Sequence, residues 1–545
     1  MLPFPLLRLP RELRDTIYSF YVIVDGGYTC DTDGFTRGKL KGASQKEVDL
    51  SLVYTCKQIA NEMDRGGLAL KLNSITFSTL NSVEFSHLAC QFQQLKSRGV
   101  DFVRCEMFQT YGHLIPDRVY AEVQKNYPQF MPLLDRMKVE GPRAPVQGTG
   151  PCLERHGPYG EAPSVYRGFI KDVLESAWTE DDSFRNLVAD FTPPMFSTDH
   201  IDKWSPFEVI KSHINPWTIP SDSQMDALEA AVPIEFSCPR TRDDRSKYRF
   251  SAAAAAVYFL ESIPHSLRKH LRKIILDEDY EAVLYPQEHA RGLIPFCQQY
   301  PIQVERRVSL WNVVFQEDMF YKHPDERCWR NQVATRRTPF VMNSDQITAN
   351  IANWITEALT LDQEGMPPGS FSLLLDGDPC PDLCSRIFKS IVQRDAAWQQ
   401  GWVENIQRGI LGQITWFERK GENVLRHGWF DFNQIDRASR SRVRADRPGY
   451  WGYIFEQFPQ SLTDIAGGTS IVHCNFDVGT PWDVESIIRK HAGWNKYKWE
   501  REWFNHTPQS WGPGPPLPQW RMLLEDNTWK HNPYGCLCPW AMKYV

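Results

Sequence analysis

The sequence contains no motif that identifies an enzyme or a cofactor site. It has no Gly-x-Ser-x-Gly turn, which carries the nucleophile of many hydrolases, and the Gly-rich turn at 467–470 lacks the lysine of a phosphate-binding loop. The aspartates at 376–382 share a turn, but the closing glutamate of a calcium loop is missing. We therefore expect no catalytic residue, no metal site and no cofactor. An enzyme whose site is formed across the fold, by residues such as His473, Asp477 and Glu485, stays an alternative.

A strong charge of one sign and long hydrophobic runs are also absent. The formal net charge is -6 and the pI is near 6.2, which gives no general attraction to nucleic acid or to an anionic membrane. The longest apolar run, Ala252 to Leu260, reaches about half-way across a bilayer. The first eight residues lack the basic segment and apolar run of a signal peptide. The sequence thus predicts no nucleic-acid partner, no membrane partner, and a cytoplasmic or nuclear location.

The 13 cysteines do not form a recognisable framework. Their number is odd and they are scattered along the chain, unlike the paired cysteines of secreted domains. Cys380 and Cys384 lie one helical turn apart, and Cys536 and Cys538 form a pair near His531, so a structural zinc is an alternative. Because the second pair is too tightly spaced for a typical zinc site, we favour buried, reduced thiols.

The length of 545 residues exceeds what a single hydrophobic core usually supports. Hydrophobic residues make up 42% and charged residues 23%, which is ordinary for a globular protein. Helical and strand-like apolar spacings alternate without a fixed repeat, which predicts a helix-rich α+β fold. The expected divisions are an N-terminal helical module with a first strand at 1–80, a mixed segment at 81–140, a Gly- and Pro-rich linker or insertion at 141–164, a main domain at 165–445, and a Trp- and Pro-rich region packed on it at 446–545.

Individual elements follow from the spacing of apolar residues. Alternating or continuous apolar side chains predict strands at 73–78, 274–276 and 371–375. Apolar positions three and four residues apart predict helices at 165–178, 251–260, 347–359 and 383–402. The segment 25–42 is rich in Gly and Asp and offers no hydrophobic face, so we expect an exposed loop there.

Tryptophan is concentrated toward the C-terminus. Thirteen of the 19 tryptophans occur from Trp398 onward, together with the proline-rich segment 511–519. Such aromatic side chains either pack against the fold or line a groove for a peptide or a sugar. We favour packing, and the groove stays an alternative.

Two amphipathic helices are predicted near the N-terminus. Pro10 suits the first position of a helix, because that position needs no N–H donor. The apolar face of this helix comprises Leu9, Leu13, Ile17, Phe20 and Tyr21. The opposite face is charged and includes Arg14. A second helix at 51–63 repeats the same apolar spacing, and we expect it to pack on the first.

This helix pair resembles the F-box motif, in the divergent form found at the start of many uncharacterised fungal proteins. The matching residues are Arg-Leu-Pro-x-Glu-Leu-Arg-x-x-Ile-Tyr at 8–18 and Thr-Cys-Lys-Gln-Ile at 55–59. The resemblance implies a module that binds the Skp1-type adaptor of a cullin ubiquitin ligase, while the rest of the chain selects a protein substrate. It also implies that Leu9, Pro10, Leu13 and Ile17 contact the adaptor.

The alternative is a self-contained structural or interaction protein. In that case the same apolar face packs into the protein's own core, as the apolar faces of amphipathic helices usually do. The two hypotheses differ in whether Leu13 and Ile17 are exposed to solvent or covered by the rest of the chain.

Overall fold

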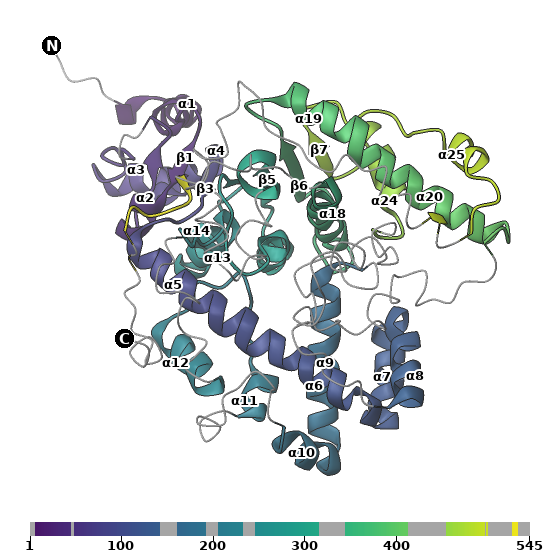
Figure 1. Cartoon of the computed structure of the whole chain (residues 1–545). Helices are drawn as coiled ribbons and strands as arrows, with labels where there is room; N and C mark the ends of the chain where they lie inside the picture. Colours follow the sequence, from purple (N-terminus) through teal and green to yellow (C-terminus); the bar gives the residue numbers. More distant parts are fainter. Residues whose placement is uncertain are drawn as a thin grey trace.

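The structure is a computed structural model that describes residues 6–44, 48–141, 161–191, 205–232, 246–315, 344–411, 454–495, 498–499, 526–531 and 533. It combines one sheet with many helices, so the predicted helix-rich α+β fold is confirmed (Figure 1). Most of the predicted linker at 141–164, the proline-rich segment 511–519 and the Cys536–Cys538 pair lie outside the described residues.

A single sheet of seven strands runs through the described part of the molecule. The strands are β1 (Tyr28–Cys30), β2 (Lys41–Gly42), β3 (Ile75–Ser78), β4 (Lys273–Glu278), β5 (Gln303–Ser309), β6 (Phe371–Asp376) and β7 (Val472–Cys474). Their spatial order is β2-β1-β3-β4-β5-β6-β7, and neighbours are parallel except for β2, which pairs antiparallel with β1 at the edge. The strands predicted at 73–78, 274–276 and 371–375 are β3, β4 and β6.

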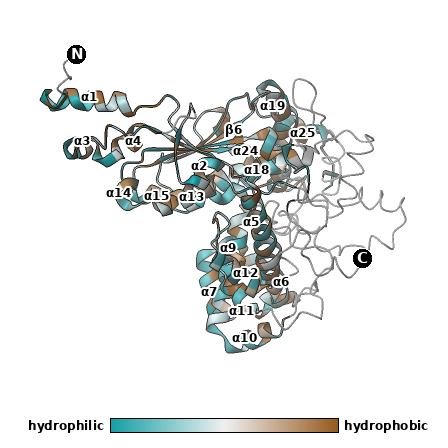
Figure 2. Ribbon diagram, turned by 90° about the vertical axis from the view of Figure 1, so that its left-hand side faces the viewer, coloured by the Kyte–Doolittle hydropathy of each residue, from teal (hydrophilic) through white to brown (hydrophobic). Residues whose placement is uncertain are grey.

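The two faces of the sheet differ in their side chains. Along β4 and β5, alternate residues such as Leu276 and Val304 are buried, whereas Asp277 and Gln303 on the other face are exposed. Parallel strands that follow chain order need right-handed crossovers, and these place the connecting helices on one face. Figure 2 shows helices α13, α14 and α15 on the same side of the sheet. Their bounds are Ala252–Ser262, His265–Arg268 and Ile294–Gln299.

The chain between β3 and α13 forms a layer of helices that extends away from the sheet (Figure 2). Helix α5, the π-helix η3 and helix α6 follow one another as a continuous rod (Figure 1). The bounds in this layer are α5 Val83–Gln93, η3 Gln94–Asp101, α6 Phe102–Tyr111, α7 Asp117–Asn126, α8 Met131–Glu140, α9 Pro163–Glu180, α10 Asp182–Ala189, α11 Pro206–Lys211 and α12 Asp222–Ala231. Helix α9 confirms the helix predicted at 165–178.

The C-terminal half adds helices around the last two strands. Their bounds are α18 Ser344–Thr360, α19 Pro381–Ile387, the π-helix η10 Phe388–Val392, α20 Gln393–Gln407, α24 Phe458–Ala466 and α25 Val484–Lys490. Trp398, Trp402 and Trp499 are buried in a small cluster between α20 and α25, so these three tryptophans pack against the fold. Among the described helices, none has the length and apolar content that crossing a membrane requires.

The segment 25–42 is not the exposed loop that its composition predicts. It contains β1, helix α2 (Thr32–Arg37) and β2, and the side chains of Tyr28 and Cys30 are buried. These two residues pair in register with Ile75 and Phe77 of β3, which supplies the apolar neighbours that the segment itself lacks. The sheet therefore continues from the predicted N-terminal module into the main domain, and both share one hydrophobic core.

The second N-terminal helix is shorter than predicted. Turns occupy 51–55, and only α3 (Lys57–Glu62) falls within the predicted range 51–63; a separate helix, α4 (Gly67–Leu72), follows it. Between the two helices, Asp64, Arg65 and Gly66 adopt φ values of 50°, 52° and 98°, which a right-handed helix cannot accommodate. As predicted, Ile59 and Met63 are buried.

Candidate functional site

Helix α1 (Arg11–Val22) is the first long element of the described chain, and it lies at an outer corner of the molecule (Figure 2). It begins one residue later than predicted, since Pro10 is extended and precedes the first helical residue. The helix packs on α4. Among the described helices, α4 is the one that α1 contacts most closely.

The face of α1 that packs inward is not the apolar one. Arg14, Tyr18 and Val22, each four residues apart, are the buried residues of the helix. The prediction that Arg14 lies on the solvent side is therefore wrong. The prediction failed because a charged side chain can be buried when another part of the chain supplies a partner of opposite charge.

The solvent-facing side of α1 carries a row of accessible apolar side chains beside the exposed polar residues Glu12 and Thr16. Leu13 is 52% exposed and Phe20 is 79% exposed, while Ile17 between them is half-buried. These three residues, spaced by four and three positions, form one row along the helix, which we name the α1 stripe. Of the other residues that the F-box resemblance singles out, Pro10 is exposed and Leu9 is half-buried.

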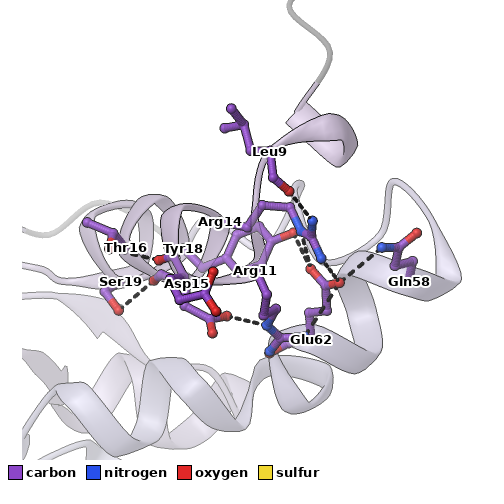
Figure 3. Close-up of polar contacts among 10 residues, drawn as sticks. Leu9, Arg11, Arg14, Asp15, Thr16, Tyr18, Ser19, Gln58 and Glu62 are labelled. Atoms are coloured by element: carbon purple, nitrogen blue, oxygen red, sulfur yellow. Dashed lines mark hydrogen bonds and ion pairs between the residues drawn. The ribbon is translucent and has the colours of Figure 1, made fainter.

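A carboxylate from α3 holds the inward face of α1. Arg14 donates two hydrogen bonds to Glu62, from Nε to Oε2 at 2.9 Å and from Nη2 to Oε1 at 2.6 Å. The Tyr18 hydroxyl donates to Oε2 at 2.7 Å, and the Gln58 amide donates to Oε1 at 3.0 Å. Figure 3 shows Glu62 with these side chains converging on it from α1 and from its own helix. We name Glu62, Arg14, Tyr18 and Gln58 the Glu62 cluster.

The charges in the Glu62 cluster are set by these hydrogen bonds. The bonds from Arg14 lower the pKa of Glu62 from 4.5 to about 2, so Glu62 is a carboxylate at neutral pH. Burial, together with the neighbouring Glu62, raises the pKa of Tyr18 to about 12, so its hydroxyl stays protonated and can donate. The guanidinium of Arg14 therefore faces a full negative charge inside the packed face.

The C-terminal end of α1 has a second anchor. The buried side chain of Asn73 donates to the Val22 carbonyl at 2.8 Å and accepts from the Val24 N–H at 2.9 Å. These bonds satisfy groups that the end of a helix leaves without intrahelical partners. Since Asn73 lies two residues before β3, the end of α1 is tied to the segment that enters the sheet.

The attachment of α1 is expected to weaken in acid. Because the pKa of Glu62 is lowered in the folded state, its contribution is complete above pH 4.5 and is lost as the pH falls toward 2. At pH 6 we expect the α1 peptide of a Glu62→Gln variant to exchange amide hydrogens about 30-fold faster than wild type, equivalent to about 2 kcal/mol. By pH 3 most of this difference should be lost. A ratio that stays constant between pH 6 and pH 3 would contradict the assigned role of the Glu62 charge.

Exposed apolar side chains are frequent in the N-terminal part of the described chain, which contains α1. Thirteen large hydrophobic residues in the described part of the chain are exposed, and six of them lie between Leu7 and Leu72. Besides Leu13 and Phe20, these include Ile23 at the end of α1 and Tyr54 in the turn before α3. The sequence pattern placed Phe20 on the apolar face, but nothing in the pattern singled out Tyr54. Large exposed apolar areas mark surfaces that bind other proteins.

The residues suggested for an enzyme site do not converge in the structure. His473 is exposed on β7, Asp477 forms an ion pair with Lys389, and Glu485 on α25 forms a separate ion pair with Arg408. A serine–histidine pair that the sequence did not reveal does exist, since Ser251 Oγ lies 2.7 Å from Nδ1 of His289.

The Ser251–His289 pair is structural. Both side chains are buried, and Ser251 also accepts from the Ala254 N–H as the N-cap of α13. Nε2 of His289 bonds the Leu284 carbonyl, and burial lowers the pKa of His289 to about 3, so the ring is neutral. A substrate has no access to a hydroxyl in this position.

The cysteines at 380 and 384 are buried thiols. Within the described ranges, no three His, Cys, Asp or Glu side chains are placed to hold a metal ion. The α1 stripe with its supporting Glu62 cluster is therefore the candidate site.

Comparison with known proteins adds no relative. No protein-family model matches the chain, and no curated protein or solved structure matches it either.

Proposed function

We propose that this protein binds another protein through the α1 stripe, and that it acts as an F-box-like substrate receptor of a cullin ubiquitin ligase. In this proposal the stripe meets a Skp1-type adaptor, with Leu9 and Pro10 at its N-terminal end. Other surfaces of the chain are left to select a protein substrate.

The observation that carries the proposal is the exposure of Leu13 and Phe20 on a helix that is otherwise well anchored. Rows of apolar side chains at helical spacing are a common means of binding a partner. In the alternative, this face belongs to the protein's own core. The packing of Leu13 does not support that alternative. Tyr18 and Val22 provide the core contacts of α1, and Tyr21 is the residue of the predicted apolar face that packs against this core.

The sheet gives the proposed receptor a fixed geometry. The residues between α1 and α3 form β1, α2 and β2, so the helix pair is attached to the edge of the sheet. An adaptor bound to α1 would therefore be held in one orientation relative to the sheet and the helical layer. Such rigidity suits a receptor that presents one protein to another.

The test is capture of a purified Skp1-type adaptor by the wild type and by a Leu13→Asp, Ile17→Asp variant. We expect the substitutions to weaken binding about 100-fold or more, because they place two carboxylates in the centre of an apolar contact. The fold should be kept, since substitutions on an exposed helix face usually change stability by about 0.5 kcal/mol or less. The readouts are a binding isotherm and a circular dichroism spectrum.

The matched control changes two other exposed apolar residues to aspartate. Leu187 is 47% exposed and Ile410 is 51% exposed, and both lie on elements remote in sequence from α1. A Leu187→Asp, Ile410→Asp variant should bind the adaptor as wild type does. The proposal fails if wild type does not bind the adaptor, or if both variants bind equally well.

A further inference from the structure

Helix α1 is oriented by polar groups. With 100° per residue, Leu13, Ile17 and Phe20 are centred about 130° around the helix axis from Arg14, Tyr18 and Val22. The buried residues thus comprise one valine, one tyrosine and one arginine, while the α1 stripe consists of apolar side chains only and Thr16 is exposed beside it. Hydrophobic burial alone would favour the opposite orientation.

The bonds to Glu62 make this orientation possible. A buried guanidinium without an acceptor is costly, and the hydroxyl of Tyr18 would also lose its partner. Glu62 satisfies both, and the side chains of Arg14 and Glu62 are 10% and 8% exposed. Arg14 additionally donates to the Leu9 carbonyl, which links the cluster to the turn that precedes α1.

We propose that Glu62 is a positioning residue for protein binding, which holds α1 in the orientation that presents the α1 stripe. Glu62 points toward Arg14 (Figure 3). Because Arg14 belongs to the inward face of α1, Glu62 acts on binding through α1 and not by touching the partner. The consequence for binding rests on the proposed function, whereas the consequence for the orientation of α1 does not.

The proposal has a kinetic signature. Suppose that only the form in which α1 is anchored can bind. A variant in which a smaller fraction of molecules has α1 anchored then shows an apparent affinity that is reduced by the same factor. The loss then appears in the association rate, because the bound complex is the same in both proteins. A residue that contacts the partner directly would instead change the dissociation rate.

The experiment compares Glu62→Ala, Glu62→Gln and Asp15→Ala in the full chain. For Glu62→Ala we expect the association rate constant for the adaptor to fall about tenfold and the dissociation rate constant to stay within about twofold. Glu62→Gln keeps an acceptor oxygen but no charge, so its loss should be smaller. Asp15→Ala breaks an exposed ion pair of Arg11 on the same helix, and its rates should equal those of wild type.

Hydrogen exchange of the free proteins gives an independent readout. Protection of the α1 peptide should fall in the order wild type, Glu62→Gln, Glu62→Ala, with Asp15→Ala at the wild-type value. This series tests the positioning role even if the wild type binds no adaptor, in which case the proposed function alone is lost. If Glu62→Ala does not fold, Glu62→Gln decides through the same two readouts. Unchanged protection of α1, or a loss of affinity confined to the dissociation rate, would overturn the inference.

Discussion

We expect an Arg306→Met variant to lose about 3–5 kcal/mol of stability, which is what removal of one partner of a buried ion pair costs. Arg306 on β5 and Glu278 on β4 are each 1% exposed, and Nη2 of Arg306 lies 2.7 Å from Oε1 of Glu278. The guanidinium also donates to the carbonyls of Pro286 and Gln287, and it stacks over Trp354 of α18. Methionine fills a similar volume but leaves Glu278 as a buried charge without a cation.

The loss is large because Glu278 has a second task. Its two carboxylate oxygens accept from the N–H groups of Ala252 and Ala253, the first two residues of α13. These N–H groups have no acceptor within the helix, and a negative charge at this end stabilises the helix. If Glu278 became protonated in the variant, the buried charge would disappear but the cap of α13 would weaken. The variant is therefore less stable than wild type whether Glu278 is charged or protonated.

Arg307 provides the matched control for this prediction. It is the next residue of β5, points to the opposite face of the sheet, and has a side chain that is 43% exposed in an ion pair with Glu305. Arg307→Met should change the stability by about 1 kcal/mol or less. Urea unfolding followed by tryptophan fluorescence would compare the two variants. Equal losses of stability in the two variants would show that burial is not the reason why the Arg306–Glu278 pair stabilises the protein.

The apolar spacing predicted those elements whose own residues dictate their structure. β3, β4 and β6 and helices α13 and α18 all carry regular apolar positions, and each lies where the sequence predicts it. β5 has the same alternation, but its charged residues Glu305, Arg306 and Arg307 conceal it. The buried Arg306 reads as a surface residue until its partner on β4 is known.

Contacts between distant segments could not be predicted. β1 is three residues long and becomes a strand only because β3 lies beside it. The pairing of β3 with β4 joins segments on either side of the helical layer, and Thr79 bonds Asp279 across 200 residues of sequence. No local sequence pattern predicts which strands are neighbours, because strand order depends on how the whole chain packs.

The candidate site was predicted in its parts but not in its orientation. The apolar spacing assigned Leu9, Leu13, Ile17, Phe20 and Tyr21 to one face of a helix. In the structure Leu13, Ile17 and Phe20 form a row on α1, whereas Leu9 precedes the helix and Tyr21 packs against the core. Whether that face is covered depends on Arg14, whose acceptor Glu62 lies 48 residues away. A hydrophobic pattern alone assigns the apolar side to the core, whereas here Arg14 is buried and Leu13 and Phe20 are exposed.

The other large effect is expected at Gly27, where the chain leaves α1 and enters β1. Gly27 has a φ of 73°, and a β-carbon at this position would lie 2.5 Å from the backbone oxygen of Ser74. That oxygen accepts the N–H of Tyr28 at 2.8 Å, which joins β1 to the start of β3. Gly27→Ala therefore adds the strain of a left-handed conformation to a clash with backbone that a side-chain movement cannot relieve. We expect a loss of about 3 kcal/mol.

Gly38 separates the strain from the clash. It has a φ of 63° at the end of α2, but a β-carbon there would meet no atom within 4 Å. Gly38→Ala should therefore cost only about 1 kcal/mol, the strain of the left-handed conformation by itself. Hydrogen exchange of the peptide that covers β1 should increase strongly in Gly27→Ala and little in Gly38→Ala. Similar exchange in both variants would mean that the close approach of Gly27 to Ser74 does not hold β1 in the sheet. The link between α1 and the sheet would then depend on Asn73, which bonds both Val22 and Val24.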